Sequence, residues 1–309
     1  MTAGRVVIAG GTGLVGRALA GSIAADGREV VVLTRQEPSL TRLPAGCRAV
    51  RWDGRSNAGW IEEAKGAAAL VNLAGESIAG LRWTRAKRRR ILDSRLRSVA
   101  AMGEALAALA ERSREPLPAL VQASAIGYYG DRRDEELDEE STPGSGFLAE
   151  TCVEWERASE AVERLGVRRA IARTGLVLAK DGGFLEPMRP LYRLGLGARI
   201  GDGRPWIPWI HLADEVAALK LLIDDPRASG PFNLTAPAPA RQRDLHRALA
   251  RALRRPAFLV VPAFALRLAL GEMSSLVLAS DRALPRRLAG LGFRHRFDEL
   301  DAALADLFG

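Results

Sequence analysis

The chain has 309 residues, of which 48% are hydrophobic and 27% are charged, and its formal net charge is +8. This length is sufficient for a large core in one large domain or two smaller ones, and no apolar run approaches the length of a membrane span. Two cysteines, Cys47 and Cys152, are too few for a disulfide framework, and the three histidines lack the local pairing of a metal site. We therefore expect a cytoplasmic protein without a metal or a membrane partner, whose positive charge suits an anionic ligand.

The first element in the chain is a short apolar run at residues 6–9, whose β-branched side chains predict a buried parallel strand. A helical pattern over residues 14–26 and a second apolar run at residues 29–33 follow. This order predicts a strand–turn–helix–strand unit of the size that binds a dinucleotide.

Three glycines occupy the turn between this strand and its helix at the spacing G-x-x-G-x-x-G, namely Gly10, Gly13 and Gly16. Gly10 permits a tight turn, Gly13 lets backbone N–H groups approach a pyrophosphate, and Gly16 lets the helix pack closely on the strand. A glycine turn in an α/β domain that binds no nucleotide is the alternative interpretation.

The end of the second strand indicates which dinucleotide binds. An NAD site has Asp or Glu there to accept hydrogen bonds from the ribose 2′-OH, whereas an NADP site needs a cation. The sequence has Thr34 and Arg35, and a guanidinium can bind the 2′-phosphate and stack on adenine. We therefore predict NADP as the cofactor, with Glu37 as the nearby carboxylate that argues against it.

Strand and helix patterns alternate through the next part of the chain. Strands are expected at residues 49–52, 66–72, 118–124 and 168–173, and helices at residues 60–65, 82–112 and 147–165. The alternation breaks down after residue 175 in a segment rich in Gly and Pro. A helix at residues 213–224, a strand at 230–235, a helix at 241–254 and a helical tail complete the chain.

This pattern predicts an α/β fold with a doubly wound, Rossmann-type parallel sheet and a smaller, mostly helical C-terminal lobe for the substrate. The dinucleotide-binding domain is expected to comprise residues 1–175, with residues 211–235 returning to it. Residues 176–210 and 236–309 are assigned to the smaller lobe, and a cleft is expected between the two.

A basic run is centred on residues 85–90, which contain five Arg and Lys residues. One interpretation is a nucleic-acid-binding patch. Ile91, Leu96 and Val99 recur at helical spacing, which favours a helix with a solvated basic face. No aromatic interleaving and no nucleic-acid module accompany the run, so we expect no nucleic-acid partner.

Several motifs in combination resemble those of one protein family. They are the glycine turn of residues 10–16, the Asn72-Leu-Ala-Gly75 turn, Ser124 at a strand end, the Trp206-Ile-Pro-Trp-Ile-His211 segment and the tail of residues 256–308. Together they resemble the atypical, extended short-chain dehydrogenase/reductases, and specifically the epimerase family proteins, which end in a short C-terminal domain of unknown function. The resemblance covers essentially the whole chain and implies NADP(H) in the cleft and a small-molecule substrate.

The resemblance also implies which residues bind the cofactor. The pyrophosphate turn is matched by Gly10, Thr12, Gly13, Leu14, Val15 and Gly16, the 2′-phosphate contact by Thr34 and Arg35, and the ribose turn by Asn72, Leu73, Ala74 and Gly75. Arg95 matches a helix position that touches the cofactor, with a surface arginine as the alternative.

Enzymes of the wider superfamily use a Tyr-x-x-x-Lys pair, in which the lysine lowers the phenol pKa and holds the nicotinamide ribose. No tyrosine of this chain has a lysine at that spacing. The expected helix instead has Phe147 or Leu148 at the tyrosine position and Thr151 or Cys152 at the lysine position, so the standard mechanism is absent. Cys152 is counted with the cofactor-binding candidates and not as a nucleophile, because nothing nearby in sequence lowers the pKa of its thiol.

Three residues at the end of the strand at 118–124 or just beyond it remain as catalytic candidates. Ser124 is expected to orient a substrate carbonyl, and Tyr128 or Tyr129 is expected to serve as the acid or base. The alternative for Ser124 is a serine at a strand end that caps local backbone. The alternative for Tyr128 and Tyr129 is aromatic packing under the cofactor.

The segment with Trp206, Trp209 and His211 is expected to line the cleft and bind substrate, with core packing as the alternative. These expectations favour an NADP(H)-dependent oxidoreductase or epimerase-like enzyme that acts on a small carbonyl or sugar-like compound. The absent Tyr/Lys pair favours the alternative, a catalytically silent NADP-binding sensor or scaffold protein. In either case we expect a monomer or a homodimer.

Overall fold

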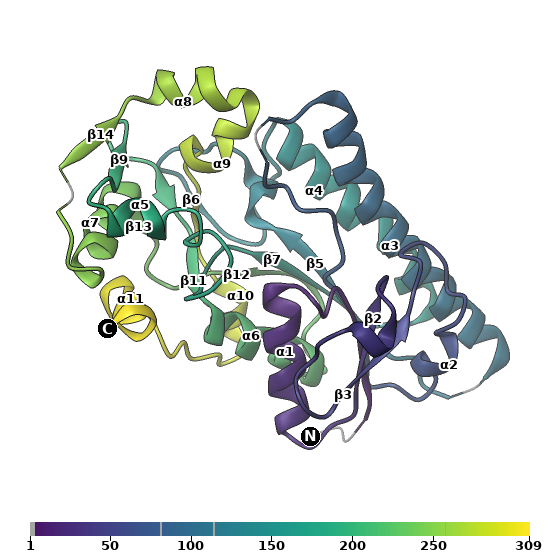
Figure 1. Cartoon of the computed structure of the whole chain (residues 1–309). Helices are drawn as coiled ribbons and strands as arrows, with labels where there is room; N and C mark the ends of the chain where they lie inside the picture. The colour runs from purple at the N-terminus through teal and green to yellow at the C-terminus, as the bar shows by residue number, and fades with distance from the viewer. Residues whose placement is uncertain (1–3, 81, 114, 257) are drawn as a thin grey trace.

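The computed structural model describes residues 4–80, 82–113, 115–256 and 258–309. Its centre is a seven-stranded sheet in the order β12-β7-β5-β4-β1-β2-β3, and all of its neighbouring strands are parallel (Figure 1). The strands are β1 (Val6–Ala9), β2 (Val30–Thr34), β3 (Cys47–Arg51), β4 (Ala69–Asn72), β5 (Ala119–Ala125), β7 (Arg169–Thr174) and β12 (Gly230–Leu234). The predicted doubly wound, Rossmann-type α/β fold is confirmed.

Helices cover both faces of this sheet, which is why β1, β2 and β4 are almost entirely apolar. On one face α1 (Leu14–Ala25) and α6 (Leu212–Asp224) bury Leu19, Ile23 and Leu219 in one core cluster with the sheet. On the other face lie α2 (Ile61–Ala64), α3 (Arg85–Arg112) and α4 (Phe147–Ala158), and α3 buries Met102 and Leu106 there.

The strand order reverses between β1 and β4, since the chain builds outward from β1 to β3 and then returns to the other side of β1. In an open parallel sheet, ligands bind at such a switch point, outside the carboxyl ends of the strands. The loops that follow β1, β2 and β4 therefore form one candidate site, and the loops after β5 and β7 lie beside it.

Two helix boundaries differ from the sequence-based prediction. The helix expected from residue 82 begins at Arg85, because the side chain of Thr84 accepts a hydrogen bond from the Lys87 N–H at 3.2 Å and caps it. The helix expected over residues 147–165 ends at Ala158 and continues as a 3₁₀ helix, because Ser159 Oγ donates to the Glu156 carbonyl at 2.7 Å.

The C-terminal lobe is built from short strands and helices around its own core, which includes Tyr192, Trp209, Leu249, Phe297 and Leu304. Its ordered elements are α5 (Arg189–Arg193), β8 (Leu176–Leu178), β9 (Ala198–Ile200), β10 (Trp206–Ile207), β11 (Trp209–His211), β13 (Ala240–Arg241), α7 (Gln242–Ala252), β14 (Leu259–Val261), α8 (Ala263–Leu270), η4 (Gly271–Ser274), α9 (Ser275–Leu278), α10 (Arg286–Gly290) and α11 (Leu300–Phe308). Within the described ranges, no helix combines the length and the apolar character that crossing a membrane requires.

One pairing joins the C-terminal segment to the sheet domain. β15 (Arg282–Ala283) pairs in parallel with β6 (Glu136–Leu137), which belongs to the long loop after β5. The residues that precede β15 are therefore held against the loop at the carboxyl end of β5.

Candidate functional site

The three glycines of the turn after β1 differ in whether the fold leaves room for a side chain. Gly10 has φ +82°, and a Cβ there would lie 2.6 Å from the Leu73 carbonyl oxygen, while a Cβ at Gly16 would collide with the Gly10 carbonyl oxygen. A Cβ at Gly13 would meet only the Gly10 oxygen, at 3.4 Å, so the fold itself does not demand a glycine there. Gly13 is the uncapped N-cap of α1, whose first turn holds no acidic residue, and this arrangement fits a phosphate.

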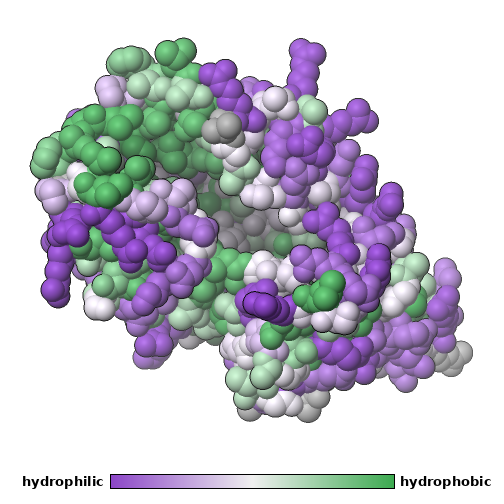
Figure 2. All heavy atoms as spheres, viewed as in Figure 1, coloured by the Kyte–Doolittle hydropathy of each residue, from purple (hydrophilic) through white to green (hydrophobic). Residues whose placement is uncertain are grey.

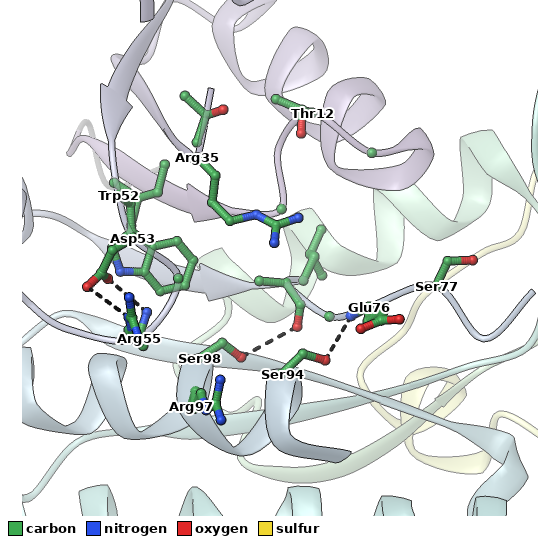
Figure 3. A pocket seen from close by; sticks show the side chains of 18 residues that line it. Thr12, Arg35, Trp52, Asp53, Arg55, Glu76, Ser77, Ser94, Arg97 and Ser98 are labelled. Atoms are coloured by element: carbon green, nitrogen blue, oxygen red, sulfur yellow. Dashed lines mark hydrogen bonds and ion pairs between the residues drawn. The ribbon is translucent and has the colours of Figure 1, made fainter. Parts of the chain in front are cut away.

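A cavity of about 690 Å³ lies at this switch point (Figure 3). The predicted cofactor residues that line it are Gly10, Thr12, Gly13, Thr34, Arg35, Leu73, Ala74 and Gly75. Residues that the sequence reasoning missed also line it, namely Leu33, Trp52, Asp53, Gly54, Arg55, Glu76, Ser77, Ser94, Arg97 and Ser98. Their signal was weak, because most of them come from the loop after β3 and from one face of α3, whose contribution depends on tertiary packing.

Asn72, predicted on the ribose turn, does not line the cavity but supports the turn that does. Its side chain is fully buried, donates to Gln122 Oε1 at 2.9 Å and accepts from the Ala74 N–H at 3.3 Å. Arg95 acts similarly, because it donates to the Glu76 carbonyl at 3.1 Å and stacks over Trp155 at 4.8 Å. Burial lowers the pKa of Arg95, and its role here is to hold the turn after β4.

Leu14, Val15 and Gly16, which were also predicted to contact the pyrophosphate, lie within α1 behind the cavity wall. Val15 packs against the core of the sheet, and Gly16 provides the close approach of α1 to the glycine turn. These three residues do not line the cavity with their side chains, but their backbone N–H groups form the uncapped start of α1.

The positively charged side chain of Arg35 lies at the end of the cavity next to β2. Arg35 extends into the cavity (Figure 3) and makes no hydrogen bond or ion pair within the described residues. Glu37, the carboxylate that argued against NADP, forms an ion pair with Arg51 at 2.9 Å and does not line the cavity. The carboxylate of Asp53 accepts the backbone N–H groups of Arg55 and Ser56, both at 2.9 Å, and these bonds lower its pKa.

A second cavity, of about 310 Å³, lies at the carboxyl ends of β5 and β7. Figure 2 shows the molecule hollowed on this face, between the C-terminal lobe and the helices beside the sheet. Phe147, Leu148 and Cys152 of α4 line this cavity, at the place where the superfamily carries its Tyr/Lys pair. Cys152 thus lines the second cavity and not the first, and burial raises the pKa of its thiol to about 11.

The predicted catalytic residues Ser124 and Tyr129 face the core. Ser124 Oγ donates to Glu156 Oε1 at 2.6 Å, and Arg173 binds both oxygens of Glu156 at 2.9 and 2.8 Å. The Tyr129 hydroxyl donates to Asn233 Oδ1 at 2.7 Å, and burial raises the pKa of Tyr129 to about 12. Both hydroxyls are engaged and buried, which favours the alternative interpretations of a structural serine and of aromatic packing.

Tyr128 is held by packing as well. The guanidinium of Arg173 lies 3.6 Å from the centroid of the Tyr128 ring, which also meets Tyr129 edge-on at 5.3 Å. Among the described residues that line the second cavity, Tyr128 does not appear. These contacts favour the alternative interpretation, aromatic packing, for both tyrosines.

Of the three residues predicted to bind substrate, only Trp206 lines a cavity at the site. Trp209 is 1% exposed and donates from Nε1 to the Ala238 carbonyl at 3.0 Å. His211 packs on Phe297 with ring centroids 4.1 Å apart, and burial lowers its pKa. The burial of Trp209 in the core of the lobe and the packing of His211 on Phe297 favour the alternative interpretation, core packing.

One polar residue of the second cavity had no sequence signal. Asp281, in the segment before β15, is 9% exposed, and its Oδ1 has no hydrogen-bond partner within the described residues. Burial and the neighbouring Asp131 raise the pKa of Asp281 to about 8. Elsewhere in the described chain, no group of three or more His, Cys, Asp or Glu side chains is placed to hold a metal ion.

The glycine turn, the switch point and the cavity above it define a dinucleotide-binding α/β protein of Rossmann type. The chain belongs to the NAD dependent epimerase/dehydratase family, which residues 6–235 match, and residues 261–307 match a domain of unknown function, DUF1731. This finding confirms the resemblance predicted from the motifs.

Relatives match over almost the whole chain. The epimerase family protein Mb2239 of Mycobacterium bovis is 39% identical over 300 residues, covering 97% of this chain and 96% of the relative. The crystal structure of human epimerase family protein SDR39U1 with NADPH has 30% identity and a TM-score of 0.84, covering 98% of both chains. The nucleoside-diphosphate sugar epimerase of Corynebacterium glutamicum has 34% identity and a TM-score of 0.77, covering 99% of this chain and 58% of that one.

Proposed function

We propose that the chain binds NADP(H) in the first cavity and acts as an oxidoreductase or epimerase-like enzyme on a small carbonyl or sugar-like compound. The observation that carries the choice of NADP is Arg35, which extends into the cavity without a partner among the described residues while Glu37 is neutralised by Arg51. The related human protein was solved with NADPH, which supports the same choice.

Each part of the cavity has a task in this proposal. The N–H groups at the start of α1 bind the pyrophosphate, because they are uncapped and no carboxylate competes for them. The turn at Leu73–Gly75 flanks the nicotinamide half, and Arg35 binds the 2′-phosphate. When bound, the nicotinamide supplies hydride transfer at C4, and the apolar second cavity keeps water from the reacting carbon.

Calorimetric titration of the purified chain with NADPH and with NADH tests the proposal. We expect NADPH to bind at least about tenfold more tightly, equivalent to about 1.4 kcal/mol, because NADH lacks the phosphate that Arg35 contacts. Equal affinities, or no binding of either, would contradict it.

A second candidate function is a catalytically silent NADP-binding sensor or scaffold. It is favoured by the engaged hydroxyls of Ser124 and Tyr129 and by the apolar residues at the Tyr/Lys position of α4. Tight NADPH binding with no NADPH oxidation across a panel of carbonyl and sugar compounds supports this function, and turnover of any compound excludes it.

A further inference from the structure

The walls of the second cavity are apolar. They include Ile126, Phe147, Leu148, Phe184, Ile207 and Leu276. No Arg or Lys is among the described residues that line the cavity. A diphosphate group needs cations or several N–H donors when it leaves water, so these walls do not suit a nucleotide sugar.

Among the described residues of this cavity, Asp281 is the one with a buried side-chain oxygen that lacks a hydrogen-bond partner. Its backbone is fixed, because Asp281 N–H donates to the Trp206 carbonyl at 3.3 Å and the preceding Ser280 donates from Oγ to the Arg133 carbonyl at 2.6 Å. The carboxyl group therefore stands on the cavity wall, with one buried oxygen that lacks a partner within the described residues. An unsatisfied buried oxygen is costly, and a polar atom of a ligand would satisfy it.

The charges around Asp281 favour its neutral form. Asp131 lines the same cavity and repels a second negative charge. The nearby cations are engaged elsewhere, since Arg282 pairs with Glu136 at 3.0 Å and Arg241 pairs with Asp134 at 2.7 Å. With its pKa raised to about 8, the Asp281 carboxyl carries a proton at neutral pH and can donate it.

Two other polar groups of this cavity, the Thr174 hydroxyl and the Cys152 thiol, are less suited to proton transfer. The Thr174 hydroxyl donates to Glu215 Oε1 at 2.8 Å, so its proton is engaged. The Cys152 thiol, whose pKa is raised to about 11, is a weak donor.

We propose that the second cavity binds an uncharged, largely apolar carbonyl compound and that Asp281 is the catalytic acid that donates a proton to its oxygen. This proposal rests on NADP(H) binding in the first cavity, and it gives the C-terminal domain of unknown function a residue in the active site. In the reduction, a hydride leaves C4 of NADPH and forms a C–H bond at the carbonyl carbon. The C=O π electrons take the Asp281 proton, which yields an alcohol and NADP⁺, and the carboxylate regains a proton from water.

Binding to the chain without cofactor tests the site independently of activity. The probes are benzylacetone, 2-octanone and UDP-glucose, titrated by calorimetry at about pH 6.5 and about pH 9.5. We expect the ketones to bind and UDP-glucose not to bind. Ketone affinity falls about two- to tenfold at the higher pH, because deprotonation removes one hydrogen-bond donor.

Two variants make this test specific. Asp281→Asn keeps the shape and a donor but does not titrate, so its ketone affinity is independent of pH. Asp298→Asn changes an exposed aspartate outside the cavity and behaves as the wild type. Infrared difference spectra at neutral pH show that Asp281→Asn weakens the carbonyl band of protonated carboxylic acids relative to the wild type, while the contribution of Glu215 remains.

Turnover completes the test. With NADPH and a ketone probe, Asp281→Asn lowers kcat about a hundredfold or more and changes KM less, because proton donation is lost while binding persists. The proposal is overturned if UDP-glucose binds in place of the ketones, if no ketone binds, or if Asp281→Asn keeps the wild-type kcat. If the chain binds no NADPH, the proposed function fails, whereas NADPH binding together with any of those results overturns the Asp281 proposal alone.

Discussion

Ser124 Oγ donates a hydrogen bond of 2.6 Å to Oε1 of Glu156, and both residues are buried. The sequence predicts that this serine orients a substrate carbonyl. In the structure its hydrogen bond joins β5 to α4. Arg173 of β7 completes the link, because it binds both carboxylate oxygens of Glu156. The network connects three elements at the carboxyl end of the sheet and thereby supports the floor of the second cavity.

Glu156→Ala is predicted to lower the free energy of unfolding by about 3–5 kcal/mol, because it leaves the Arg173 guanidinium buried without its charge partner. Glu154→Ala, which breaks an exposed pair with Arg157, is predicted to change it by less than about 0.5 kcal/mol. Urea unfolding measures both values. Similar small effects for the two variants would show that the buried network does not stabilise the fold.

Arg35→Asp is predicted to weaken NADPH binding strongly and NADH binding little, because the substitution repels the 2′-phosphate that only NADPH carries. Arg42→Asp, at an exposed position outside the first cavity, controls for the change in net charge. Calorimetry with both dinucleotides gives the ratio of affinities. An equal loss for NADPH and NADH means that Arg35 does not contact the phosphate.

Gly16 and Gly13 of the same turn are predicted to serve different purposes, Gly16 the stability of the fold and Gly13 the binding of NADPH. Gly16→Ala lowers the free energy of unfolding by about 1–3 kcal/mol, because its Cβ collides with the Gly10 carbonyl. Gly13→Ala leaves stability nearly unchanged but weakens NADPH binding, since its Cβ extends into open space before α1. Thermal unfolding and calorimetry separate the two effects, and unchanged NADPH affinity in Gly13→Ala argues against a pyrophosphate at this helix.

Stability is predicted to fall as the pH rises from about 6.5 to about 8. Burial raises the pKa of Glu215 from 4.5 to about 8 and that of Asp281 from 3.8 to about 8, so in this window the folded chain binds protons that the unfolded chain does not. Each carboxyl contributes up to about 1.4 kcal/mol per pH unit. The lowered pKa values of His211 and His295 act with the opposite sign, but only below their ordinary value of 6.5.

Glu215→Gln removes one of these two contributions. The variant is therefore expected to lose less stability than the wild type between about pH 6.5 and pH 8, whereas the exposed Glu140→Gln keeps the wild-type slope. Urea unfolding at four pH values measures the slopes. A wild-type slope that is flat or rising across this window contradicts buried, protonated carboxyl groups.

The sheet was predictable from sequence because its order follows from local patterns. Apolar runs such as residues 6–9 fix the strands, and right-handed βαβ connections then restrict how they assemble. The glycine turn and Arg35 were predictable for the same reason, since the groups that make a phosphate site lie within one βαβ unit.

The second cavity was not predictable because its walls come from distant segments. Asp281 reaches the loop after β5 through the β6–β15 pairing and through the hydrogen bonds of Ser280 to that loop, which no local pattern indicates. The direction of the tyrosine side chains was not predictable for a related reason. It depends on Arg173 and Asn233, which come from β7 and β12.

A crystal structure of the chain with NADPH tests the central claim most directly. We predict the pyrophosphate at the N-terminus of α1, the 2′-phosphate in contact with the Arg35 guanidinium, and the nicotinamide at the mouth of the second cavity beside β5. A 2′-phosphate that points into solvent away from Arg35, or a dinucleotide bound elsewhere on the molecule, would contradict the account.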